Sequence, residues 1–165
     1  MRLHVLAVPG ATSRELAAQV RRAVSLGVDL ALIVVGANDL TRLVPSAQAA
    51  SALGSAVTTL RAAGARVVVA PAPDLSGFPA IPVAMRPFVH QACRRLQQQQ
   101  AAATEAAGGA VAPVSAELAR AFAADPAMYS RDRFHPSSAG YARIADVLTP
   151  YIVAAAGTAA LQPEH

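Results

Sequence analysis

The sequence predicts an α/β fold, a three-layer α/β/α sandwich in which helices cover both faces of a parallel sheet. Short, continuously apolar runs of strand length alternate along the chain with longer segments whose apolar residues recur at helical spacing. Strands that are apolar throughout are typical of parallel sheets, which right-handed helical crossovers bury on both faces. We therefore expect ligand sites at the carboxyl ends of the strands.

Four apolar runs predict the strands, at residues 3–8, 29–35, 66–70 and 110–114. The first run closes on Pro9 and Gly10, which fits a buried strand that ends in a turn. The second is followed at once by Gly-Ala-Asn-Asp at 36–39, and we expect a functional loop there. The third is rich in β-branched valine, which favours strands.

Five segments predict helices, at residues 13–26, 46–63, 86–107, 115–124 and 138–155. Residues that favour helix ends bound them, since Thr12 or Ser13 can cap the first and Gly27 can stop it. The Pro-rich stretch 71–87 predicts an irregular loop, which we expect to form a substrate-facing wall. The glutamine run 97–100 is expected on a solvated helix surface.

Length and composition indicate one folded domain. We expect a single domain over residues 1–156, with a flexible tail at 157–165. With 54% hydrophobic and 15% charged residues, the chain does not have the composition of a disordered protein. All fourteen basic residues are Arg and they are scattered, so a net charge of +4 does not predict a nucleic-acid partner.

Three further features of the sequence bear on the cellular location of the chain and on its cofactors. The first apolar stretch is too short for a signal peptide, and no segment reaches transmembrane length, so the chain as given is expected to be cytoplasmic. A secreted or cell-envelope location would follow if an N-terminal segment were missing. Cys93 is the only cysteine, so no internal disulfide can form, and we expect this residue to be buried. His90 lies one helical turn from Cys93, and these two side chains alone would be too few ligands for a metal site. We therefore expect neither a metal nor a cofactor.

Polar residues that suit acyl transfer follow the predicted strands or precede the last helix. His135 is the candidate base because imidazole titrates near neutral pH, and Asp132 can fold back across one turn to fix its tautomer. The alternative is that Asp132 starts a turn and His135 is an ordinary surface residue.

The candidate oxyanion donors are Asn38 and Gly10. Asn38 can donate its side-chain amide, and Gly10 its backbone N–H. Gly36 allows the backbone to approach a bound carbonyl closely, and we assign Gly36 and Asp39 to substrate binding. The alternative is that residues 36–39 form a simple turn at the end of a strand.

In this order, the polar stretches resemble the sequence blocks of the SGNH hydrolases, also called GDSL esterases and lipases. Residues 8–13 look like the second block, whose glycine is an oxyanion donor, and 35–40 look like the third, whose Asn is another. Residues 132–137, followed by Gly140 and Tyr141, are similar to the fifth block, whose Asp and His complete a triad. The resemblance implies the flavodoxin-like SGNH fold and a Ser-His-Asp esterase or lipase acting on a small-molecule ester. The oligomeric state stays open.

The family's first block, a Gly-Asp-Ser after its first strand, has no counterpart in the chain. The resemblance therefore implies an N-terminally truncated fold, with the nucleophilic serine outside the chain. Ser13 lies near the expected cleft, but its place at a helix start favours capping over nucleophilic attack. A second interpretation is an inactive truncated protein that binds a ligand or a partner. A nucleotide-binding protein is disfavoured because no phosphate-binding glycine pattern follows any strand.

Overall fold

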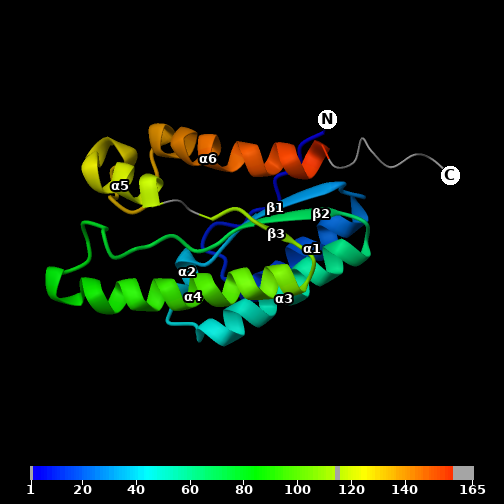
Figure 1. The fold of residues 1–165 in the computed structure, drawn as a ribbon, viewed down its shortest axis with the longest axis horizontal. Helices are drawn as coiled ribbons and strands as arrows, with labels where there is room; N and C mark the ends of the chain where they lie inside the picture. The colour runs from blue at the N-terminus through cyan, green and yellow to red at the C-terminus, as the bar shows by residue number, and fades with distance from the viewer. Residues whose placement is uncertain (1, 114–115, 158–165) are drawn as a thin grey trace.

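A computed structural model describes residues 2–113 and 116–157, and it has the predicted α/β architecture (Figure 1). The elements follow in the order η1 (Ser13–Glu15), α1 (Leu16–Ser25), β1 (Leu30–Val34), α2 (Ala37–Thr41), α3 (Ser46–Ala62), β2 (Arg66–Ala70), η2 (Val83–Met85), α4 (Arg86–Ala106), β3 (Ala110–Val111), α5 (Ala116–Ala124), η3 (Pro126–Met128) and α6 (Ser138–Gly157), where η marks a 3-10 helix.

The sheet is parallel and has the order β1-β2-β3 among the described residues. Leu30 of β1 lies opposite Arg66 of β2, and Val34 lies opposite Ala70, so the two strands end in register. The turn after β1 and the loop after β2 therefore leave the sheet from one edge, where ligand sites of parallel sheets form.

Helices lie on both sides of this sheet, with α1, α3 and α4 on one side and α6 on the other (Figure 1). Side chains of β2 alternate between the two faces, as strand geometry requires. Val67 and Val69 pack in the cluster shared with α1 and α3, whereas Val68 and Ala70 pack with Leu148 of α6. The sheet is thus buried on both faces at β2.

Most predicted elements are confirmed. The strands at 29–35 and 66–70 and the helices that follow them are present, while the fourth strand is shorter than predicted and covers only Ala110–Val111. Residue 114 of the predicted fourth strand, residue 115 of the predicted fifth helix and residues 158–165 of the predicted tail lie outside the described residues, while Gly157 is the last residue of α6. Where a loop was expected after β1, the short helix α2 forms. None of the described helices combines the length and apolar character needed to cross a bilayer.

The strand predicted at residues 3–8 is wrong. These residues have no regular secondary structure, and the side chains of Leu3 and Val5 are 81% and 77% exposed. An apolar run becomes a strand only where a neighbouring strand takes its backbone hydrogen bonds, and the described sheet ends at β1 without pairing to this segment. Only Leu6 packs partly against the core.

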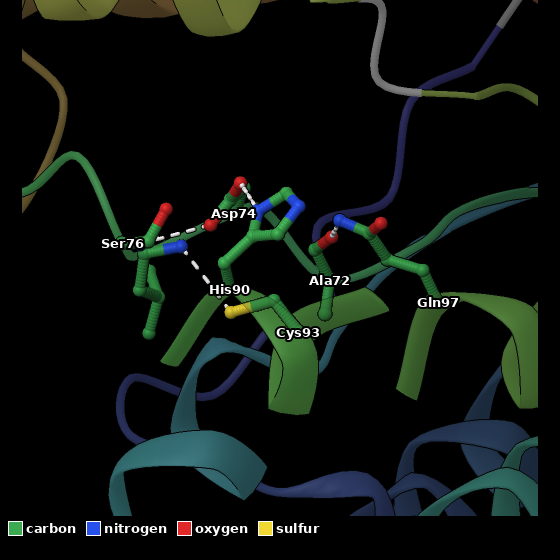
Figure 2. A network of polar contacts seen from close by, with 7 residues as sticks. Ala72, Asp74, Ser76, His90, Cys93 and Gln97 are labelled. Atoms are coloured by element: carbon green, nitrogen blue, oxygen red, sulfur yellow. Dashed lines mark hydrogen bonds and ion pairs between the residues drawn. The ribbon is translucent and has the colours of Figure 1, made fainter. Parts of the chain in front are cut away.

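The expectation of a solvated glutamine run is also wrong, because two of its side chains bind the strand ends. Gln100 is fully buried: its Oε1 accepts a hydrogen bond from Ala72 N at 2.8 Å, and its Nε2 donates to Val35 O at 3.2 Å. Gln97 Nε2 donates to Ala72 O at 2.9 Å (Figure 2). The backbone groups just past β1 and β2 need such partners because they are partly or fully buried and lie beyond the hydrogen bonds of the sheet.

Replacing Gln100 with alanine is expected to lower the free energy of unfolding by about 1–3 kcal/mol. The substitution removes the partner of the buried Ala72 N–H and of the partly buried Val35 carbonyl, and leaves both without that hydrogen bond. Urea unfolding followed by circular dichroism measures the change. Gln98→Ala, an exposed position on the same helix, is the matched control. Equal unfolding midpoints for the two variants would contradict this role of Gln100.

Candidate active site

The loop before α6 folds back on itself and brings Asp132 against His135. Ser130 N donates to His135 O at 2.8 Å, and an antiparallel bridge joins Tyr129 to Pro136. Across this turn His135 Nδ1 lies 2.6 Å from Asp132 Oδ2. The contact that the spacing of these two residues predicts is therefore formed.

The Asp132 carboxylate is held by several donors besides the imidazole. Its Oδ1 accepts from Ser130 Oγ at 2.7 Å and from the backbone N–H groups of Phe134 and His135, both at 2.9 Å. The hydrogen bond from Ser130, followed by those from His135 and the backbone, holds the pKa of the Asp132 carboxyl well below its usual range. An ionised Asp132 accepts a hydrogen bond from Nδ1–H of His135, which leaves Nε2 as the nitrogen with the free lone pair.

His135 and Asn38 line one cavity of about 740 Å³. Asn38 enters it from the start of α2, and His135 enters from the loop before α6, so two segments far apart in sequence converge there. The remaining walls come from the residues on either side of Gly10, from the loop after β2, and from α5 and α6. The structure thus brings the predicted base and the predicted oxyanion donor to a common space.

Asn38 also ties the segment around Gly10 to the end of β1. Its Nδ2 donates to Ala11 O at 3.0 Å, which uses one of the two N–H bonds of the amide. Gly10 adopts a positive φ of 76°, and the cavity is lined by Val8 and Ala11 on either side of it. The predicted donors at Gly10 and Asn38 therefore lie in adjoining segments.

The two residues assigned to substrate binding have different surroundings. Gly36 lines the cavity and has a φ of 128°, and any side chain there would place its Cβ only 2.5 Å from Ala72 Cβ, so the packing requires glycine. Asp39 is fully buried, and its carboxylate accepts hydrogen bonds from Ser13 N at 3.1 Å and Ser13 Oγ at 3.0 Å. Neither Asp39 nor the fully buried Ser13 lines the cavity, and the substrate-binding assignment of Asp39 stays a prediction.

The loop after β2 forms one wall of the cavity through residues 73–78, and α4 holds it in place (Figure 2). His90 Nδ1 lies 2.7 Å from Asp74 Oδ2, and Leu75 N donates to Cys93 Sγ at 3.4 Å. Cys93 is buried, as predicted, and burial raises the pKa of its thiol. Within the described chain, no cluster of three or more His, Cys, Asp or Glu side chains could hold a metal ion.

An aromatic cluster that the sequence did not reveal joins this wall to the His135 loop. Phe78 packs edge to face on Tyr129 and Phe134, with ring centroids 5.2 and 5.6 Å apart. Phe134 packs in the same way on the His135 ring at 5.1 Å. The contacts of Phe78 with Tyr129 and Phe134 join residues far apart in sequence, so no local sequence pattern predicts them. Each such aromatic pair stabilises the folded state by about 0.5–1.5 kcal/mol beyond the burial of its surface.

Comparison with known families agrees with the family resemblance of residues 8–13, 35–40 and 132–137. The model of the GDSL-like lipase/acylhydrolase family matches residues 1–143. The chain belongs to this family. The resemblance drawn from the sequence is therefore confirmed, and so is the fold that it implies.

One curated relative and one solved structure are similar to this GDSL-like chain. It is 42% identical over 151 residues to the GDSL-like esterase Rv1075c of Mycobacterium tuberculosis, a match that covers 90% of the chain and 48% of the relative. The chain thus spans about half the length of this curated relative. Its fold is similar to that of the psychrotrophic esterase EstA from Pseudoalteromonas sp., with a TM-score of 0.67 and 19% identity over 86% of the chain and 70% of EstA.

Replacing Ser130 with alanine is expected to raise the pKa of Asp132 toward its usual range, because it removes the hydrogen bond from Ser130 Oγ that helps to stabilise the carboxylate. A carboxyl whose pKa is lowered by folding stabilises the folded state above its unfolded pKa, and this contribution is lost as the pH falls toward the folded value. Carboxyl-carbon NMR titration measures the shift. Ser55→Ala, whose hydroxyl bonds within α3, should leave Asp132 unchanged; an equal shift in both variants would contradict the assignment.

Proposed function

We propose that the chain supplies the base, the orienting carboxylate and oxyanion donors of a carboxylic-ester hydrolase, with the nucleophilic serine outside the 165 residues. The observation that carries the proposal is that His135, which is paired with Asp132, lines the same cavity as Asn38. A cavity of about 740 Å³ suits a small-molecule ester. The description of Rv1075c as an esterase supports the same reaction class.

The proposed chemistry is acyl transfer in two steps. The serine oxygen attacks the carbonyl carbon of the ester while Nε2 of His135 takes the serine proton, and Asp132 holds the resulting imidazolium in orientation. Asn38 and the N–H of Gly10 donate hydrogen bonds to the oxyanion. His135 then returns the proton to the leaving alkoxide. Water hydrolyses the acyl-enzyme by the same route, which regenerates serine and releases the carboxylic acid.

The direct test is hydrolysis of short p-nitrophenyl esters by the chain and by a form extended with any in-frame segment encoded upstream of Met1. His135→Ala in the active form is expected to lower kcat/KM by about 10²–10⁴-fold, the usual contribution of a general base. His90→Ala, which breaks the other His–Asp pair, should lose far less because His90 does not line the cavity.

Full activity in the His135→Ala variant would remove this residue from the mechanism. If no extended form is labelled by a fluorophosphonate, the alternative of an inactive, ligand-binding or partner-binding protein is favoured instead. Labelling of the extended form that disappears when its added serine is replaced would support the esterase assignment.

Asn38→Ala is expected to lower kcat by about 10²–10³-fold with a smaller effect on KM, because an oxyanion donor acts mainly in the transition state. Thr41→Ala, an exposed position on the same short helix, is the matched control. Since Asn38 also bonds Ala11, unfolding midpoints must be compared. A loss of kcat that merely follows a loss of folded protein would count against the role in catalysis.

A further inference from the structure

The hydrogen bond of His135 to Asp132 does not by itself fix the imidazole. Nδ1 lies 2.6 Å from Asp132 Oδ2, while the His135 side chain is 66% exposed. A single hydrogen bond holds one atom of the ring, and the ring plane can still turn about that bond. General-base catalysis needs Nε2 within hydrogen-bond reach of the attacking oxygen. A second contact is therefore needed to fix the plane of the ring.

Phe134 supplies this second contact. Its ring and the His135 ring lie edge to face, with centroids 5.1 Å apart and planes at 85°. Phe134 is partly buried, whereas Arg133 and His135 on either side of it are exposed. Arg133 has a φ of 56°, in the left-handed region that few residues other than glycine adopt. The tight turn at Arg133 thus places a partly buried ring against an exposed imidazole.

Phe78 contacts both arms of this turn. Its ring packs on Phe134 at 5.6 Å and on Tyr129 at 5.2 Å. Tyr129 and Phe134 lie on opposite arms, because the bridge from Tyr129 to Pro136 closes the turn. Tyr129 packs in the same way on Phe122 of α5, at 5.2 Å. A continuous series of rings therefore leads from α5 through Phe78 to the imidazole.

The wall that carries Phe78 is anchored to α4 and not to the turn. Phe78 N donates to Leu75 O at 3.0 Å, and Leu75 N donates to Cys93 Sγ of α4 at 3.4 Å. His90 of the same helix pairs with Asp74 of the wall (Figure 2). A side chain supported by a helix holds its neighbours more firmly than one on an unsupported loop. Phe78 can therefore act as the fixed point for the turn.

We propose that Phe78 is a positioning residue of the base: through Phe134 it fixes the plane of the His135 imidazole and so couples the wall of the cavity to the direction of Nε2. The restraint on the imidazole needs only the ring contacts, while its effect on catalysis rests on the proposed function. Edge-to-face contacts depend on ring geometry, so the position requires an aromatic side chain and not merely an apolar one.

The first test follows the ring nitrogens of His135 in the 165-residue chain by two-bond ¹H–¹⁵N NMR correlation. In the neutral imidazole the bond to Asp132 favours the Nδ1–H tautomer, which separates the two ¹⁵N shifts. Phe78→Leu should narrow this separation, because a ring that turns loses the bond for part of the time and populates the other tautomer. Phe78→Tyr, which keeps the ring, should retain the parent spectrum. Phe88→Leu, the same substitution at an exposed Phe outside the cavity lining, is the matched control.

The second test measures ester hydrolysis by the active form. Phe78→Leu is expected to lower kcat by about 10–100-fold with a smaller change in KM, because misalignment of a catalytic group slows the chemical step. Phe134→Leu should have a similar effect. The double variant should be no slower than either single variant, since Phe78 acts through Phe134. Phe88→Leu should have the kinetics of the parent.

A parent-like His135 spectrum in Phe78→Leu would overturn the proposal, and so would equal spectral changes in Phe78→Leu and Phe78→Tyr. A rise in KM at unchanged kcat would make Phe78 a substrate contact instead, and additive losses in the double variant would mean that it acts by another route. If no form hydrolyses esters, the proposed function fails, while the ring shifts still decide whether Phe78 positions the imidazole. Unfolding midpoints confirm that folded proteins are compared, and Phe134→Leu replaces Phe78→Leu in the NMR test if the latter does not fold.

Discussion

The position of the candidate site depends on the side chain of Gln100. It bonds the carbonyl of Val35 after β1 and the N–H of Ala72 after β2, and so holds the two strand ends at the point where their connections diverge. From this point one connection leads through Gly36 to Asn38, and the other forms the wall at 73–78. Because both connections start at the backbone groups that this buried amide bonds, its loss is expected to disturb Asn38 and the wall together.

On the side of the cavity formed by the His135 loop and the free edge of β1, no buried side chain joins the segments as Gln100 does among the described residues. The His135 loop is braced by Phe78 through Phe134, yet the imidazole is exposed and the β1 edge beside the cavity has no strand partner within the described chain. A parallel sheet normally gains its stability from burial on both faces and pairing on both edges of its inner strands. The described chain satisfies this condition at β2 and not at β1.

Local patterns predicted those features whose physical causes are local. The apolar runs of β1 and β2 and the one-turn contact of Asp132 with His135 follow from short-range geometry, and all are found. Residues 3–8 have the same apolar pattern, but a strand also needs a partner, which lies beyond any local signal. The sequence predicts a surface position for Gln100 because most glutamine side chains are exposed. The side chain is buried because backbone groups after two strands distant in sequence satisfy its hydrogen bonds.

Two histidine–aspartate pairs with nearly equal geometry show why a contact alone does not identify a site. His90 lies 2.7 Å from Asp74, and His135 lies 2.6 Å from Asp132. The first pair joins α4 to a loop, and only its carboxylate residue reaches the cavity, so it serves to hold the wall. The second presents its imidazole to the space that Asn38 also faces. What separates a structural pair from a candidate catalytic one is therefore the surface that the histidine faces, which depends on the parallel sheet and its connections.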